Sequence, residues 1–164
     1  MSLSHKDIYL SYIDCVLTMY YKNSYIEILN KVEHWSKVDG YNIKKPFMSN
    51  VRLLSFYSQK DKQKQRTKKG DTTKLLYYGL KYLVDKNIIH QNMNIVVEVD
   101  PSVNNNLVKK VYKSIGFSVL AHELDINNGF TLMYSHMSDL YKRCLSLRPN
   151  QNSLYVDNQF HSNI

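Results

Sequence analysis

Apolar residues at spacings of three and four recur through the first forty positions and predict two helices. The first apolar face comprises Ile13, Val16, Leu17, Tyr20 and Tyr21. After the break at "KNS", the second face comprises Tyr25, Ile28, Leu29, Val32 and Trp35. Ser24 and Glu27 have the spacing of a capping box, which favours a helix start at this point, and Asp39-Gly40 would end the helix. We therefore expect two N-terminal helices.

The middle of the chain changes to a pattern of strand, helix and strand. "VRLLSFYS" (51–58) is rich in β-branched and aromatic residues, and "NIVVEV" (94–99) has the continuous apolar character of a strand buried on both faces. Between them, the wholly non-apolar segment 59–71 precedes a predicted helix over residues 73–86. A crossover of this length predicts that the two strands are parallel neighbours.

The C-terminal third reads as a helix, a hairpin and a short helix. The helix over residues 105–115 stops at Gly116, and two strand-like runs flank "DINNG", where Asn-Gly is a strong hairpin signal. A short helix follows His136. The predicted fold class is α+β: a mixed sheet with helices on both faces, two N-terminal helices and a C-terminal antiparallel hairpin. We expect one domain over residues 1–148 and a polar tail over residues 149–164.

Composition narrows the class of protein without choosing a function. The 164 residues are 43% hydrophobic, which suits a globular domain, and the net charge of +8 favours an anionic partner such as nucleic acid, a membrane surface or a phosphorylated cofactor. Cys15 and Cys144 form neither a disulfide framework nor a metal-binding spacing, and no histidine pair has ligand spacing, so we predict no metal.

No apolar run approaches the ~20 residues of a membrane span. We expect a soluble intracellular protein of the cytoplasm or nucleus, with no signal peptide and no membrane partner.

The segment "NIVVEVDPSVNNNLVKKVYKSIGF" resembles the strand-helix segment of the GNAT superfamily of acyl-CoA-dependent N-acetyltransferases. Asn105, Val108, Val111-Tyr112 and Gly116-Phe117 fall at the family's spacings. "NNGFTLMYS" is similar to the family's last hairpin, and "RTKKGDTTKLLYYGLKYLVDKNI" to the loop and helix that bind the cofactor's pyrophosphate. The resemblance covers roughly residues 51–137. It implies transfer of an acetyl group from acetyl-CoA, as co-substrate, to an amine by direct attack.

The cofactor loop departs from the family pattern. Where the family has Gln or Arg, then Gly, then Gly or Ala, this chain has Thr67, Gly70 and Thr72, and Arg66 stands one position early. Residues 38–50 also leave room for one short strand where the family usually has two.

A phosphate site at this loop also has a physical basis, because a helix N-terminus offers free N–H groups and partial positive charge. Gly70 would allow close backbone approach. The alternative is a solvated charged loop in which Asp71 or Thr72 is an ordinary N-cap. The predicted cofactor-binding residues are Arg66, Thr67, Lys68, Lys69, Gly70, Asp71, Thr72, Thr73, Asn105 and Tyr112.

The resemblance implies that Tyr112 lies near the thioester sulfur and protonates the departing thiolate. Asn105 precedes Tyr112 by seven residues, so it lies two turns away near the same face of the helix. The alternative is that Tyr112 is a core aromatic residue. An attacking amine must be neutral, and Glu98 is the first candidate for its base; alternatively, Glu98 is simply ion-paired or exposed. Weaker candidates for the base are His90, His122 and His136.

The resemblance places the acceptor site near residues 21–25 and 125–129, between the first helix pair and the last hairpin. The acceptor could be a protein amine, a polyamine or another small amine. Two other functions remain open: a non-catalytic binding protein of the same fold, and a nucleic-acid-binding protein built on the basic loop, which is less favoured because no reader motif is present.

Overall fold

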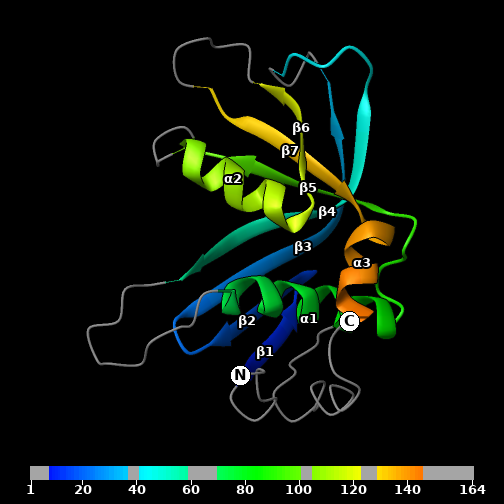
Figure 1. The fold of residues 1–164 in the computed structure, drawn as a ribbon. Helices are drawn as coiled ribbons and strands as arrows, with labels where there is room; N and C mark the ends of the chain where they lie inside the picture. The colour runs from blue at the N-terminus through cyan, green and yellow to red at the C-terminus, as the bar shows by residue number, and fades with distance from the viewer. Residues whose placement is uncertain (1–7, 37–40, 59–69, 101–104, 123–128, 146–164) are drawn as a thin grey trace.

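The computed structural model describes residues 8–36, 41–58, 70–100, 105–122 and 129–145. They form a seven-stranded mixed sheet with three helices packed on one face (Figure 1). The sheet order is β1-β2-β3-β4-β5-β7-β6. In chain order the elements are β1 (Ile8–Ile13), β2 (Val16–Tyr21), β3 (Ser24–Trp35), β4 (Phe47–Ser58), α1 (Asp71–Asp85), β5 (Asn94–Val99), α2 (Asn105–Ile115), β6 (Ser118–His122), β7 (Thr131–His136) and α3 (Met137–Leu145).

The N-terminal region is an antiparallel meander, so the prediction of two N-terminal helices was wrong. Side chains alternate between the two faces of each strand: Leu17, Met19 and Tyr21 are buried, whereas Tyr20 is exposed. Asp14 and Cys15 both have positive φ and form a two-residue hairpin turn between β1 and β2. The apolar residues therefore satisfied a period of two, and pairing with the neighbouring strands decided between the two periods.

The central strand-helix-strand prediction is confirmed. β4 and β5 are parallel neighbours, and α1 connects them, beginning at Asp71 and ending at Asp85. β4 begins earlier than predicted, at Phe47 rather than Val51, because it pairs with the long strand β3 as far as Trp35.

The closing elements also follow the prediction. β6 and β7 form an antiparallel pair, β7 lies between β5 and β6, and α3 follows β7 directly. The predicted hairpin loop and the polar tail (149–164) lie outside the described residues. The coarse class, α+β with a mixed sheet, is thus the observed one.

Within the described residues, α1, α2 and α3 all contribute to one hydrophobic core on the same face of the sheet, which corrects the expectation of helices on both faces. Residues from α1, α2 and α3, among them Leu76, Tyr112 and Leu140, share that core with Val97 of β5. The opposite face, which we call the outer face, carries a smaller apolar cluster around Trp35, Tyr41, Ile43, Val96, Ala121 and Leu132.

β4 and β5 are paired over a short stretch and then diverge. They pair only at Val51, Arg52 and Leu53 of β4, although β4 continues to Ser58 and β5 to Val99. Figure 1 shows the two strands diverging, with α1 and α2 over the diverging ends. This divergence leaves β4 backbone beyond Leu53 without a partner on β5 and sets the position of the site.

Candidate functional site

A pocket of about 750 Å³ lies where the end of β4, the start of α1 and one side of α2 meet. This volume is in the range of small-molecule sites in proteins. Its described lining is mostly apolar and carries hydroxyl groups but no carboxylate, cation or histidine. The lining residues are Phe56, Tyr57, Ser58, Gly70, Thr72, Thr73, Leu107, Val108, Val111, Tyr112 and Ser114.

The first turn of α1 borders this pocket. Its N-cap, Gly70, has φ of 92° and makes no side-chain capping hydrogen bond, so no side chain of the cap covers the first-turn amides. A Cβ added at Gly70 would meet no atom within 4 Å, which shows that the backbone faces open space. Thr72 is positioned by a 2.9 Å hydrogen bond between its hydroxyl and that of Ser24. The arrangement can accept an anionic group against backbone amides and Thr hydroxyls.

Tyr112 lies on α2 and joins the pocket to the core. Its ring is 5.6 Å from that of Phe56 and 5.7 Å from that of Phe117, and the side chain is only 7% exposed. Burial raises the pKa of Tyr112 to about 12. No described residue is seen to form a hydrogen bond with its hydroxyl, which therefore is a protonated phenol at neutral pH and can donate to a ligand in the pocket.

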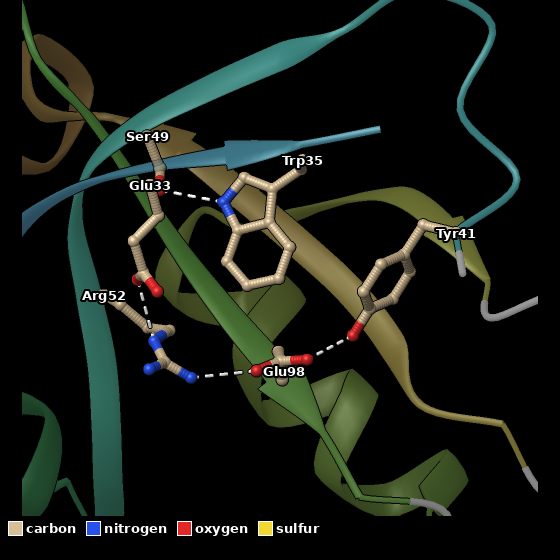
Figure 2. A network of polar contacts seen from close by, with 6 residues as sticks. All are labelled: Glu33, Trp35, Tyr41, Ser49, Arg52 and Glu98. Carbon is tan, nitrogen blue, oxygen red and sulfur yellow. Dashed lines mark hydrogen bonds and ion pairs between the residues drawn. The ribbon is translucent and has the colours of Figure 1, made fainter. Parts of the chain in front are cut away.

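Glu98 lies on the outer face, away from the pocket, in a polar network (Figure 2). Its carboxylate accepts a 2.9 Å bond from Arg52 and a second hydrogen bond from the hydroxyl of Tyr41. Arg52 also pairs with Glu33 at 2.9 Å. The carboxylate is thus held by two donors, and it is not among the residues that line the pocket.

The structure brings together part of the predicted cofactor site. Gly70, Thr72, Thr73 and Tyr112 line one pocket, whereas Asp71 is buried and is not part of the lining. Asn105 begins α2, but its side chain is outside the described part of the structure. The predicted residues Arg66, Thr67, Lys68 and Lys69 lie outside the described residues.

The remaining candidates do not meet at the pocket. His90, His122 and His136 are exposed and are not lining residues. Of the expected acceptor site, Tyr21 is buried in the main core, Tyr25 lies on the outer face, and residues 125–128 are not described.

Sequence reasoning missed Phe56, Tyr57 and Ser58, the C-terminal end of β4. The sequence offered an indication of these residues, because they end a predicted parallel strand and ligands commonly bind beyond the carboxyl ends of such strands. Leu107 also lines the pocket and was missed; its 58% exposure is visible only in the structure.

Two further properties concern metals and membranes. Within the described ranges, no group of three or more His, Cys, Asp or Glu side chains is placed to hold a metal ion. No helix in the same ranges combines the length and apolar character needed to cross a bilayer.

Comparison with known proteins identifies the fold alone. No protein-family model matches the chain, and no curated protein matches it. A solved structure described as a crystal structure of a bacterial toxin aligns with a TM-score of 0.50 and 11% sequence identity, over 81% of this chain and 73% of that one. At this identity, the two chains are similar in fold, and the comparison carries no function.

Proposed function

We propose that this protein is an N-acetyltransferase that binds acetyl-CoA in the pocket between β4, α1 and α2 and transfers the acetyl group to an amine. The observation that carries the proposal is that, where β4 and β5 diverge, the N-terminus of α1 at Gly70 and the phenol of Tyr112 border one apolar pocket. These are the groups that the sequence resemblance assigns to the pyrophosphate and to the thioester. The order strand, helix, strand, helix and antiparallel pair from β4 to β7 is also the order that the resemblance implies.

The pocket suits the parts of acetyl-CoA in different places. The apolar side of α2, with Leu107, Val108 and Val111, suits the methylene groups of the pantetheine arm. The first turn of α1, with Thr72 and Thr73, suits the pyrophosphate, because amides and hydroxyls there can donate to its oxygens.

The proposed reaction is a single displacement. The amine nitrogen attacks the acetyl carbonyl carbon, the bond between that carbon and sulfur breaks, and the electron pair leaves with the sulfur. Tyr112 donates a proton to the thiolate, the amine gives up a proton to solvent, and the products are an N-acetyl amine and CoA with a free thiol. The phenol regains its proton from solvent.

A second function, binding of acyl-CoA without transfer, is favoured by one observation. The described lining contains no carboxylate or histidine that could deprotonate the amine, and Glu98 is engaged by Arg52 and Tyr41 on the outer face. Binding and turnover must therefore be measured separately.

The test is calorimetric titration of the full chain with acetyl-CoA, followed by an assay for CoA thiol release with a panel of amines. Val111→Trp should fill the pocket and weaken acetyl-CoA binding at least tenfold, about 1.4 kcal/mol. Val119→Trp is the matched control, because Val119 is exposed to 37% and Val111 to 39%, and Val119 does not line the pocket.

Absence of acetyl-CoA binding by the unmodified protein would overturn the proposal. Equal loss in both tryptophan variants would remove the pocket from the binding site. Binding without thiol release for any amine would select the non-catalytic function.

A further inference from the structure

Four tyrosines form a continuous row across β1, β2, β3 and β4 on the outer face. Tyr9 is the cross-strand partner of Tyr20, Tyr20 of Tyr25, and Tyr25 of Tyr57. Successive ring centroids are 5.8, 4.5 and 5.1 Å apart. We call these four residues the tyrosine row.

The row is accessible over most of its length. Tyr9, Tyr20 and Tyr57 are 44%, 45% and 43% exposed, and the three described helices pack against the opposite face of the sheet. Cross-strand aromatic pairs stabilise a sheet, and a contiguous row of exposed rings is also surface of the kind that marks interaction sites.

The charge beside the row favours a cation. Glu27 lies two residues from Tyr25 on the same face, and its carboxylate accepts a 2.8 Å hydrogen bond from the Ser55 hydroxyl. Burial, together with the neighbouring Glu27, raises the pKa of Tyr25, so this ring is a neutral phenol at neutral pH. Ammonium groups are attracted both to the faces of such rings and to a carboxylate, whereas phosphate groups would be repelled by the carboxylate.

The row leads to the pocket. Tyr57 is its last member on β4 and also one of the residues that line the pocket. The pocket lies on the helix-covered face, and β4 has no partner on β5 beyond Leu53, so a long ligand on the row can pass the free edge of β4 beside Tyr57 and reach the pocket with one end.

The sheet face restricts the chemistry of this ligand. β2 and β3 are paired on both sides, so their backbone groups are used within the sheet, and the face there offers rings, hydroxyls and a carboxylate. A peptide lying across β2 and β3 would find no backbone partners, because the unpaired backbone of the described sheet lies at the outer edge of β1 and on β4 beyond Leu53. A chain of methylene groups interrupted by ammonium groups needs only the rings and the carboxylate.

We propose that the tyrosine row and Glu27 bind a linear aliphatic polyamine and direct its terminal amine past Tyr57 into the pocket. The four strands span roughly 14 Å at about 4.8 Å per strand, which suits an extended triamine or tetraamine. This inference rests on the proposed transferase function, since it names the acceptor class of that reaction.

The experiment is calorimetric titration of the full chain with spermine, in parallel with acetyl-CoA. Tyr20→Leu should weaken spermine binding about three- to fivefold, because the cation loses an aromatic face. Glu27→Gln should weaken it about fivefold or more, because the amide keeps the shape of the side chain without the charge. Neither change should alter acetyl-CoA affinity, since neither residue lines the pocket.

Two matched controls accompany these variants. Tyr20→Phe keeps the ring and should retain spermine affinity within about twofold. Asp139→Asn removes an exposed carboxylate from α3, far along the chain from the row, and should have no effect on spermine affinity.

The outcomes separate this inference from the proposed function. Acetyl-CoA binding without spermine binding, or spermine affinity unchanged in both Tyr20→Leu and Glu27→Gln, overturns the inference and leaves the transferase function standing. Spermine binding at the row without acetyl-CoA binding overturns the acceptor role. Tighter binding of a lysine-rich peptide or a single-stranded oligonucleotide, lost in the same variants, would overturn the choice of a polyamine.

Discussion

Tyr112 is the residue whose role can be tested most directly, because its hydroxyl and its ring do different things. Tyr112→Phe keeps the ring contacts with Phe56 and Phe117 and removes only the hydroxyl. We expect turnover to fall about ten- to hundredfold, at the low end for general acid catalysis, because a pKa raised to about 12 makes this phenol a weak acid. The measurement is the rate of thiol release at saturating acetyl-CoA.

The same variant has a control in its binding and stability. Acetyl-CoA affinity should be unchanged, and thermal stability should fall little, because the hydroxyl has no hydrogen bond to lose among the described residues. Unchanged turnover in a folded Phe variant would make Tyr112 a core residue only.

Gly70 is the second residue with a defined prediction. Its φ of 92° is strained for any residue with a Cβ, so Gly70→Val should shift the first turn of α1 and weaken acetyl-CoA binding at least tenfold. Gly116, also at positive φ (123°) but outside the pocket lining, provides the comparison. Gly116→Val should lower stability and leave acetyl-CoA affinity intact; a similar loss of affinity in both variants would point to a general effect of unfolding.

At the scale of elements, the seating of α1 on β2 and β3 depends on a close approach at Gly79. A Cβ there would lie 3.0 Å from Met19 Sδ and 3.1 Å from Ile26 Cδ1. We expect Gly79→Leu to lower the free energy of unfolding by about 2 kcal/mol or more through overpacking, as measured by chemical denaturation.

Gly79→Ala is the matched change. Its better helix propensity, worth about 1 kcal/mol, opposes the close contact, so its net effect should be small. If Leu were tolerated as well as Ala, the helix would not be packed as closely as the structure shows.

Arg52 of β4 links its strand to β3 and β5 through one carboxylate on each of them. It bonds Glu33 of β3 and Glu98 of β5 from its own strand, β4, just before β4 and β5 diverge. The pairing keeps two partly buried carboxylates beside one cation, where each would otherwise repel the other. The network therefore stabilises the point from which the two strands part.

At the scale of the whole molecule, the stability of the fold at high pH depends on an ionisable group in the core, the thiol of Cys144. Burial raises the pKa of the Cys144 thiol, whose unperturbed value is 9.0, to about 12. Because the folded pKa is the higher one, the unfolded state loses its proton first as the pH rises. The neutral thiol thus favours the fold fully below pH 9, and this contribution is lost between pH 9 and 12.

The prediction is a steep alkaline loss of stability that depends on this thiol. By pH 11 the thiol should account for about 2–3 kcal/mol of the loss relative to pH 8. Cys144→Ala should be less stable at pH 8, because it leaves a small cavity, but should lose less on going to pH 11. Equal losses in the two proteins, measured by urea denaturation at each pH, would contradict burial of the thiol.

The chain from residue 71 onward was predicted well because its signals are local. The Gly116 stop, the continuous apolar run 94–99 and the crossover length each specify an element without reference to the rest of the fold. The candidate pocket was located in part for the same reason, since Gly70 and Tyr112 belong to that local pattern.

The N-terminal region was predicted wrongly because its local signals were ambiguous. Leu17, Met19 and Tyr21 alternate as a strand requires, yet their apolar neighbours also match a helical face. Pairing with β1 and β3 satisfies the backbone of β2 and buries these side chains under α1, and that pairing is non-local.

The sequence by itself determined the α+β class, the parallel β4–β5 pair and the helices that border the pocket, because each follows from periodicity, length and turn residues within one segment. Only the tertiary structure decided which face Glu98 occupies, that four distant tyrosines form one row, and that Tyr57 joins this row to the pocket. The physical reason is register: a shift of one residue in strand pairing sends every side chain to the other face of a sheet. That register is set by contacts between strands far apart along the chain.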